Sequence, residues 1–246
     1  MPKPTFFRLP ADRRDRLVEE AILEFADRTY AEASLSQIGQ RARIPKGSFY
    51  QYFEDKLDLY RWLLTEEVPR RKRAFLGAPD DDEGFWARLE TQIERGMGFL
   101  VEHPRLARLS AAAADPTALP EVRGLHKAIC DAGLNELREV LARGKASGDL
   151  DVADLDMATR LVSTVIGPGL TDVVLQELGA ELHEVLASDS LRKKLGPKRR
   201  RELARDAVRF IRHGLGGGAK SDVQANPNVG AKSTVRTTVR TKRSSR

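Results

Sequence analysis

Apolar residues recur at helical spacing along nearly every long segment of the chain, and this pattern constrains the fold more than any other feature. One face of the segment 10–28 is apolar and consists of Leu17, Val18, Ala21, Ile22 and Phe25. Comparable stripes predict further helices over 34–43, 46–53, 54–73, 84–102, 104–113, 121–147, 155–187 and 199–215. No alternating run is long enough for a half-buried strand, so the predicted fold class is all-α.

Proline and glycine mark where these helices end. Pro45 disfavours a helical conformation at Ile44 and separates the second helix from the third. The sequence GPG at 167–169 predicts a kink or a break inside the segment 155–187. The acidic, turn-rich stretch GAPDDDEG at 77–84 is the best candidate for a domain boundary.

The net charge of +6 is unevenly distributed. Residues 1–76 carry 15 Lys and Arg against 12 Asp and Glu, residues 77–218 carry 20 against 23, and residues 219–246 carry 7 against 1. Positive ends on a nearly neutral body favour a polyanionic partner. The last stretch lacks leucine, isoleucine and aromatic residues, so we expect a disordered basic tail over 216–246.

Several classes of protein are disfavoured by what the sequence lacks. No window approaches the ~18 apolar residues of a membrane helix, and the first residues show no signal-peptide core, so we expect a cytoplasmic protein. The single cysteine, Cys130, excludes an internal disulfide and a cysteine zinc cage. His103, His126 and His183 have no metal-ligand spacing. Phosphate-loop, zinc-protease and serine-hydrolase motifs are absent, so we predict no enzyme, cofactor or metal site.

The best functional signal is a short helix, a three-residue turn and a second short helix, the arrangement that delivers a helix to the DNA major groove. The 21 residues from Ala33 to Phe53 contain no Asp or Glu, where the chain average of 36 in 246 predicts about three. A surface that approaches phosphates needs this, because carboxylates would repel the duplex. Arg41, Arg43 and Lys46 remain in the window.

The third helix has one side suited to the core and one suited to DNA. Phe49 and Phe53 point inward, whereas Lys46, Tyr50 and Gln51 fall on the outward side. Tyr50 and Tyr52 cannot both lie in the core, so at least one of them is exposed. At the start of the helix, the N–H groups and hydroxyl of Gly47 and Ser48 can meet a phosphate. Tyrosine can contact sugar or a thymine methyl, and glutamine can pair with adenine.

The stretch EEAILEFADRTYAEASLSQIGQRARIPKGSFYQYFEDKLDLY, with its pattern SxxxI…A…KGSxYxYFxxKxxL, resembles the DNA-binding domain of the TetR/AcrR family of bacterial transcriptional regulators. The resemblance covers roughly residues 10–62, and the later helices resemble the family's ligand-binding and dimerisation domain more weakly. It implies a homodimer that binds a palindromic operator, usually represses, and is released by a small molecule. The implied domains are 1–76 for DNA binding and 77–215 for ligand binding and dimerisation.

Carried over residue by residue, the match implies phosphate contacts from Ser34, Lys46, Gly47, Tyr52 and Lys56, and base or sugar contacts from Ser48, Tyr50 and Gln51. The chain departs from the family pattern at four positions, which are Thr29, Gly39, Arg43 and Pro45. Arg43 stands where a turn glycine is usual, and it either adds a phosphate contact or alters the angle between the two helices. Pro45 stands in place of a capping serine, which removes one expected phosphate contact.

The C-terminal residues support less specific predictions. Candidates for an effector pocket are Phe85, Trp86, Met97, Phe99, His126 and Cys130, with plain core packing as the alternative. We expect Cys130 to be a small buried residue rather than a redox sensor. The stripe predicted for the dimer interface consists of Leu203, Ala207, Val208, Ile211 and Leu215. The basic run KRRR at 198–201 has no structural reason at this level, and a solvated patch is the default.

Two functions therefore compete. The first is a dimeric, ligand-responsive repressor that binds double-stranded DNA. The second is a non-specific or architectural DNA-binding protein in which the basic tail does much of the binding. Salt dependence and sequence preference separate them, because tail-driven binding is steeply salt-dependent and shows little preference.

Overall fold

The computed structural model describes residues 1–78, 83–114 and 117–214, and the backbone alone for Lys46. These residues form helices and no strand, which confirms the all-α class. The first elements in the chain are α1 (Pro4–Phe7), α2 (Ala11–Asp27), α3 (Leu35–Ala42), α4 (Lys46–Phe49), α5 (Lys56–Trp62), the π-helical turn η1 (Leu63–Glu67) and α6 (Val68–Leu76). Those that follow are α7 (Phe85–Glu102), α8 (Pro104–Ala113), α9 (Pro120–Ala146), α10 (Leu155–Thr164), the π-helical turn η2 (Val165–Gly169), α11 (Leu170–Leu178), α12 (Leu182–Ala187), α13 (Asp189–Lys194) and α14 (Pro197–Gly214).

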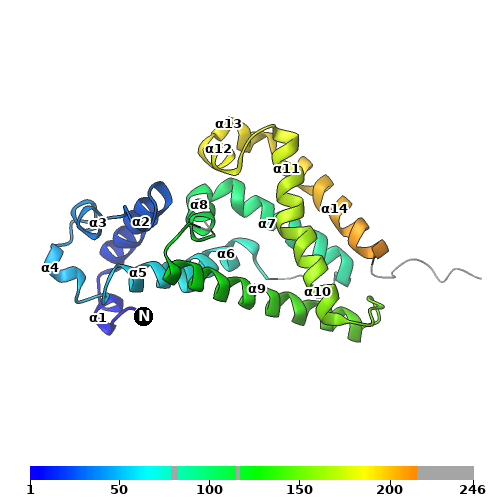
Figure 1. Ribbon diagram of the computed structural model, residues 1–246, viewed down its shortest axis with the longest axis horizontal. Coiled ribbons are helices and arrows are strands. Elements are labelled where there is room, and N and C mark those ends of the chain that lie inside the picture. The colour runs from blue at the N-terminus through cyan, green and yellow to red at the C-terminus, as the bar shows by residue number, and fades with distance from the viewer. Residues whose placement is uncertain (79–82, 115–116, 215–246) are drawn as a thin grey trace, which may run out of the picture.

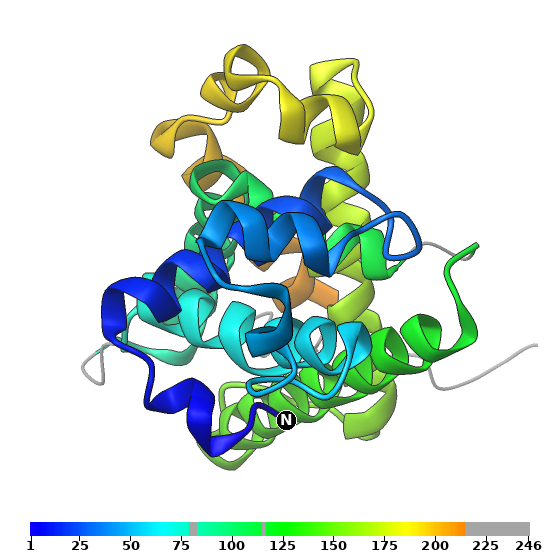
Figure 2. The ribbon, with the colours of Figure 1, turned by 90° about the vertical axis from the view of Figure 1, so that its left-hand side faces the viewer.

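Helices α1 to α4 form one end of an elongated molecule, with α4 at the tip (Figure 1). Figure 2 shows the molecule from that end, with these helices toward the reader. Their apolar faces share one core with α5 and η1, in which Phe25, Ile38, Phe49 and Phe53 are almost fully buried. Leu109 of α8 belongs to the same core, and α8 packs along α2. The helix-turn-helix end is thus seated directly on the following helices.

A second core lies at the other end, where α7 and α14 pack side by side and α9 packs on α10 (Figure 1). Its buried members include one residue from each of these helices, namely Phe85, Leu141, Val162 and Leu203. The predicted ends of α2, α7, α8, α9 and the start of α14 lie within two residues of the observed ones. No helix of the described chain is long and apolar enough to cross a membrane.

The helix predicted over 54–73 begins two residues later and ends three residues later than expected. The helix begins only at Lys56, because the Asp55 side chain accepts the backbone N–H of Asp58 at 2.7 Å and caps it. It then continues through the π-helical turn η1 to Leu76. Two helices were missed altogether, since α1 has four residues and α13 has six, which is too short to show a periodic stripe.

The segment 155–187 stays helical where GPG stands and does not break there. The chain forms η2, whose wider turn accommodates Pro168. Gly169 is needed because a Cβ there would lie 3.0 Å from the carbonyl oxygen of Thr164. The actual break comes later, at Gly179, which ends α11 in the left-handed conformation with φ 61°.

The basic run at the start of α14 is explained by ion pairs to neighbouring helices. The pairs are Arg199 with Glu177 of α11 at 2.6 Å, Arg200 with Glu102 of α7 at 3.4 Å, and Arg201 with Glu94 of α7 at 3.5 Å. Each exposed pair contributes at most about 1 kcal/mol. The run is thus paired with neighbouring helices, so a solvated patch is not its whole role.

Candidate nucleic-acid interface

The turn between α3 and α4 is unusually tight. Arg43 ends α3 in the left-handed conformation with φ 57°, which explains why a glycine would suit this position. The N–H of Ile44 donates to the carbonyl of Gly39 at 2.8 Å. A Cβ on Gly39 would lie 3.0 Å from the carbonyl oxygen of Ile44, so this glycine permits the close approach. Two departures from the family pattern therefore shape one turn.

The start of α3 is capped by Ser34 and held by a carboxylate of α2. The Ser34 hydroxyl accepts the N–H of Gln37 at 3.4 Å, as expected of an N-cap. The N–H of Ser34 donates to Glu24 of α2 at 2.9 Å, and not to the Gln37 side chain that a full capping box requires. A buried carboxylate from α2 therefore accepts the N–H that a reciprocal capping box would use.

Residues Pro45–Phe53, hereafter the reading segment, contain α4 and the turns that follow it. Phe49 and Phe53 are buried and stack at 5.6 Å, which confirms their predicted inward direction. Tyr50 is 53% exposed, and Gln51 is also exposed, so both side chains project from the tip. The regular helix ends at Phe49, and only turn hydrogen bonds continue to Phe53, so the predicted helix over 46–53 was too long.

The other residues predicted to contact DNA lie in different surroundings. Gly47 and Arg43 are exposed, and a Cβ on Gly47 would meet nothing within 4 Å. Ser48 is half-buried. Tyr52 is half-buried and packs against the first core, so Tyr50 is the more accessible of the two tyrosines.

The Arg41 side chain is held away from a DNA role. Its guanidinium donates to Glu20 at 2.8 Å and to Glu24 at 2.8 Å, both on α2. Burial alone would raise the pKa of Glu24, but the N–H of Ser34 and the guanidinium of Arg41 outweigh it and hold that pKa below its usual value. This carboxylate therefore stays charged and locks α3 onto α2, a role that the spacing of residues in sequence did not reveal.

Lys56 also has a structural role that sequence reasoning missed. Its ammonium group donates to the carbonyls of Tyr30 at 2.7 Å, Ala31 at 3.2 Å and Ala33 at 3.0 Å. It also lies over the Tyr30 ring, 4.6 Å from the centroid. Partial burial lowers the pKa of Lys56. All three ammonium protons are thus directed at the loop between α2 and α3, which leaves none aimed outward at a phosphate.

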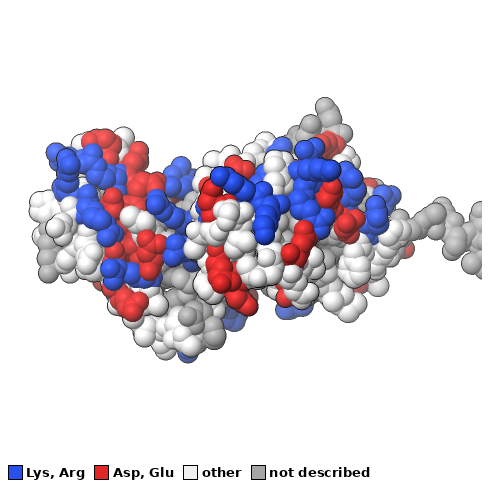
Figure 3. Space-filling model, turned by 90° about the horizontal axis from the view of Figure 1, so that it is seen from above, with Lys and Arg blue, Asp and Glu red and all other residues white. Residues whose placement is uncertain are grey.

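Charge at the tip follows from the composition of the window. In the view of Figure 3 the described surface at the extreme end that carries α4 is mostly white, and blue and red side chains are interspersed directly behind it. With Arg41 paired, Arg43 and Lys3 are described side chains that bring positive charge next to the reading segment, and the Lys3 ammonium lies 2.9 Å from the carbonyl oxygen of Tyr50. The arrangement offers a phosphate backbone an exposed guanidinium, helix N–H groups and hydroxyls from a stretch of chain, Ala33 to Phe53, that contains no Asp or Glu.

The predicted effector-pocket residues are divided between the two cores and the surface of α9. Phe85, Trp86 and Met97 pack in the second core, whereas Phe99 lies in the first. Two further candidates lie on α9, where His126 is half-buried and Cys130 is exposed. The expectation of a buried Cys130 was wrong, because the middle of this long helix presents that side to solvent. His126 Nε2 lies 3.5 Å from the Cys130 sulfur.

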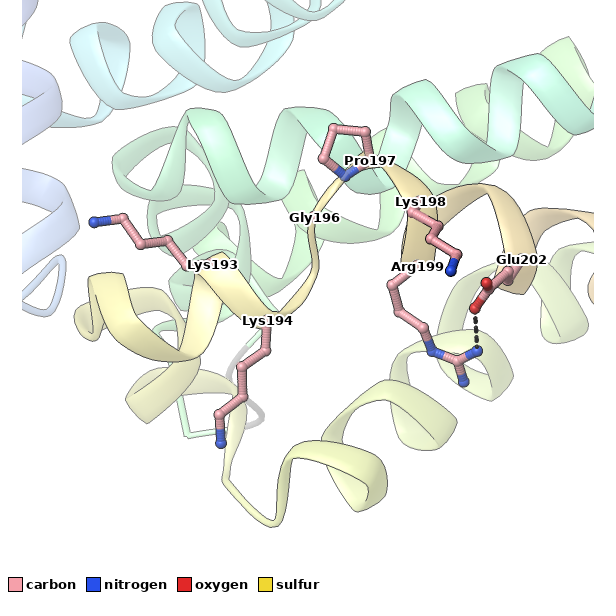
Figure 4. Close-up of a pocket in the computed structure, with 7 residues that line it drawn as sticks. All are labelled: Lys193, Lys194, Gly196, Pro197, Lys198, Arg199 and Glu202. Carbon is pink, nitrogen blue, oxygen red and sulfur yellow. Dashed lines mark hydrogen bonds and ion pairs between the residues drawn. The ribbon is translucent and has the colours of Figure 1, made fainter.

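Two cavities of the described chain lie elsewhere. One, of about 340 Å³, lies between α13 and the start of α14 and is lined by Lys193, Lys194, Gly196, Pro197, Lys198, Arg199 and Glu202 (Figure 4). The other, of about 750 Å³, lies between α1, α2 and η1, with Phe6, Val18 and Trp62 among its lining residues. Neither includes a residue predicted for the effector pocket.

The stripe predicted for the dimer interface has another partner in this structure. Leu203, Ala207, Val208 and Ile211 are buried within the protomer, where α14 packs along α7. Leu215 lies outside the described residues. The stripe is apolar because it faces this core, so these side chains are not available to a second protomer in this arrangement.

Comparisons with known proteins agree with the geometry of the tip. The family model described as "Bacterial regulatory proteins, tetR family" matches residues 17–62. The HTH-type transcriptional repressor SCO4008 of Streptomyces coelicolor is 30% identical over 102 residues, which are 42% of this chain and 50% of that protein. The HTH-type transcriptional activator FasR of Mycolicibacterium smegmatis is 42% identical over 62 residues, which are 25% of this chain and 28% of that protein. The matches to these two proteins thus span half of their length or less.

A solved structure extends the likeness to nearly the whole fold. A TetR family transcriptional regulator from Chloroflexus aurantiacus is 30% identical, with a TM-score of 0.62 over 87% of this chain and 98% of that one. Sequence identity and shared architecture therefore coincide over both ends of the molecule. The chain is a member of the TetR family of bacterial transcriptional regulators.

Proposed function

We propose that the protein is a homodimeric repressor that binds a two-fold symmetric DNA operator and is released by a small-molecule effector. The observation that supports this proposal most is the exposure of two polar side chains at the tip of the molecule. Tyr50 and Gln51 project there from a segment held by a buried aromatic pair, within the window from Ala33 to Phe53 that contains no Asp or Glu. A short helix presented in this way suits the major groove.

Each exposed group has a distinct role in the proposal. Tyr50 and Gln51 contact base edges or sugars, with Ser48 beside them. Arg43, the N–H of Gly47 and the Ser34 hydroxyl contact phosphates. Two sets of such contacts, one from each protomer, require half-sites about one helical turn apart or a multiple of it. The side chains of Lys46 and Tyr52 were assigned to phosphates from the family match, and we retain both.

The dimer interface needs a surface other than the buried stripe of α14. Four large apolar side chains are half exposed or more on α10, α11 and α14, namely Met157 at 57%, Leu161 at 56%, Val173 at 50% and Phe210 at 68%. Exposed apolar surface of this kind is typical of an interface. We assign it to a second copy of the chain, because a symmetric operator requires two reading segments. Leu161→Glu or Phe210→Glu should yield monomers that keep their helical content.

The division of labour along the chain follows from this assignment. Residues 1–76 bind DNA, residues 77–215 bind the effector and form the dimer, and residues 216–246, which lie outside the described residues, add non-specific affinity. The curated relatives include a repressor and an activator. We favour repression because release by a small molecule is the habit of the family, and no catalytic role is expected.

The test is selection of bound duplexes from a random-sequence pool, followed by sequencing. Full-length protein and a form ending at residue 215 are compared at two salt concentrations. An enriched two-fold symmetric motif, the same for both forms, is the expected result. Binding without any enriched motif that weakens mainly on removal of the tail would instead support a non-specific DNA-binding protein.

A further inference from the structure

The reading segment ends in three carbonyl groups that its own helix does not satisfy. The last carbonyls of any helix lack intrahelical donors, and α4 is only four residues long. The carbonyls of Tyr50, Gln51 and Tyr52 follow one another directly after it. An unanchored end of this kind would leave the direction of the Tyr50 and Gln51 side chains poorly defined.

Residues near the beginning of the chain supply a donor to each of the three. The Lys3 ammonium donates to the carbonyl of Tyr50 at 2.9 Å, and the backbone N–H of Lys3 donates to that of Tyr52 at 2.8 Å. The Thr5 hydroxyl donates to the carbonyl of Gln51, which lies between them. Figure 2 shows the start of the chain passing beside this part of the tip.

The donors are themselves fixed by buried packing. Phe6 is only 1% exposed, and its ring lies 5.1 Å from that of Phe53 and 5.0 Å from that of Trp62. The N–H of Phe6 also donates to the carbonyl of Lys3 at 2.9 Å, which closes the turn of α1. Lys3 and Thr5 are thus anchored to the core that holds the reading segment from behind.

We propose that Lys3 and Thr5 are positioning residues, which set the orientation of the reading segment without reading DNA themselves. This inference deepens the proposed function and rests on it. Their side chains are directed at backbone carbonyls, so their effect reaches DNA through Tyr50 and Gln51. A positioning role predicts a loss of operator affinity with little loss of affinity for unrelated sequences. Contacts to DNA phosphates tolerate a small rotation of the reading segment better than contacts to base edges do.

Each test variant removes one hydrogen-bond donor and is compared with a control variant that leaves this donor in place. Thr5→Val removes the hydroxyl and keeps the shape, whereas Thr5→Ser keeps the hydroxyl. Lys3→Met removes the ammonium, and Arg8→Met removes an exposed positive charge from the same segment as a control. Loss of one such hydrogen bond should weaken operator binding by about 3- to 10-fold in Thr5→Val and Lys3→Met. Thr5→Ser and Arg8→Met should behave as the original protein does.

Two measurements test this on the full-length protein. Amide hydrogen exchange without DNA should be faster at residues 51–53 in Thr5→Val than in Thr5→Ser, and this result does not depend on DNA binding. Titrations with operator and unrelated duplex should show the loss on the operator alone, with an unchanged dependence on salt. Equal exchange and equal operator affinity for Thr5→Val and Thr5→Ser would overturn the inference.

The salt dependence separates positioning from direct contact. If Lys3 touched a phosphate itself, Lys3→Met would weaken both duplexes and reduce the slope of log affinity against log salt by about 1, and the inference would fail. If the original protein did not prefer the operator, the proposed function would fail, while the exchange comparison would still decide whether Thr5 braces the reading segment.

Discussion

Lys56 offers the sharpest separation between a structural role and a DNA contact. Family resemblance implies a phosphate contact, whereas the structure directs its three protons to the carbonyls of Tyr30, Ala31 and Ala33. Lys56→Met keeps the length of the side chain and its packing over Tyr30 but removes the donors. We therefore expect a loss of stability and a normal salt dependence of DNA binding.

The size of the effect follows from the three hydrogen bonds. Bonds from a charged donor contribute about 1.5–3 kcal/mol each when buried. Here water can replace part of them, since Lys56 is half-buried and Ala31 is exposed, and the variant no longer desolvates an ammonium group. A net loss of about 2 kcal/mol is expected. For a protein of this size that corresponds to a decrease in Tm of roughly 4–8 °C.

The assay is urea denaturation followed by circular dichroism, at one protomer concentration because dimerisation adds to stability. Lys72→Met is the matched control, because Lys72 is an exposed lysine on α6. The control should stay within about 0.5 kcal/mol of the original protein. The reasoning is refuted if Lys56→Met has unchanged stability and its salt slope falls by about 1, as the loss of a phosphate contact requires.

Three further predictions concern single positions. Arg43→Gly should stabilise the fold by about 1 kcal/mol, as measured by denaturation, because glycine adopts φ 57° without strain. The same change should weaken operator binding and lower the slope of log affinity against log salt by about 1, as measured by titrations at several salt concentrations. Glu24→Gln should cost about 1–3 kcal/mol near pH 7, because Arg41 loses its charged partner. The pKa of Glu24 in the folded protein lies below its ordinary value of 4.5, so the stabilisation by this carboxylate is present above pH 4.5 and disappears as the pH falls through the lowered pKa. The difference in unfolding free energy between the original protein and Glu24→Gln should therefore shrink in acid. A difference that stays constant with pH would contradict the assignment. Gly144→Ala should cost about 1–3 kcal/mol with operator affinity unchanged at temperatures where the variant is folded, because its Cβ would lie 2.6 Å from the Phe85 ring.

Much of the fold could be predicted because helical periodicity reports which face of a segment is buried. Phe49 and Phe53 are four residues apart, so their inward direction and the outward direction of Tyr50 followed from spacing alone. Periodicity does not report what the buried face packs against. The stripe of α14 was therefore recognised as apolar and given to a second protomer, although α7 covers it.

The missed parts of the site depend on contacts between residues distant in sequence. Lys3 and Tyr52, or Lys56 and Ala31, meet only after the chain has folded, and no local pattern marks them. Arg41 looked like a free positive charge because its acidic partners stand about 20 residues earlier, outside the acid-free window. Composition could locate a surface suited to DNA, but the pairing of its charges had to come from the structure.

The central claim is that Tyr50, projecting from the reading segment, recognises base pairs. The most direct measurement is the ratio of operator affinity to affinity for an unrelated duplex, for the original protein, Tyr50→Ala and the control Leu100→Ala, which truncates an exposed side chain on α7. We predict that Tyr50→Ala lowers this ratio by about 10-fold or more, because affinity for the operator falls while affinity for the unrelated duplex stays the same. Leu100→Ala should leave the ratio unchanged. An unchanged ratio for Tyr50→Ala would contradict the account.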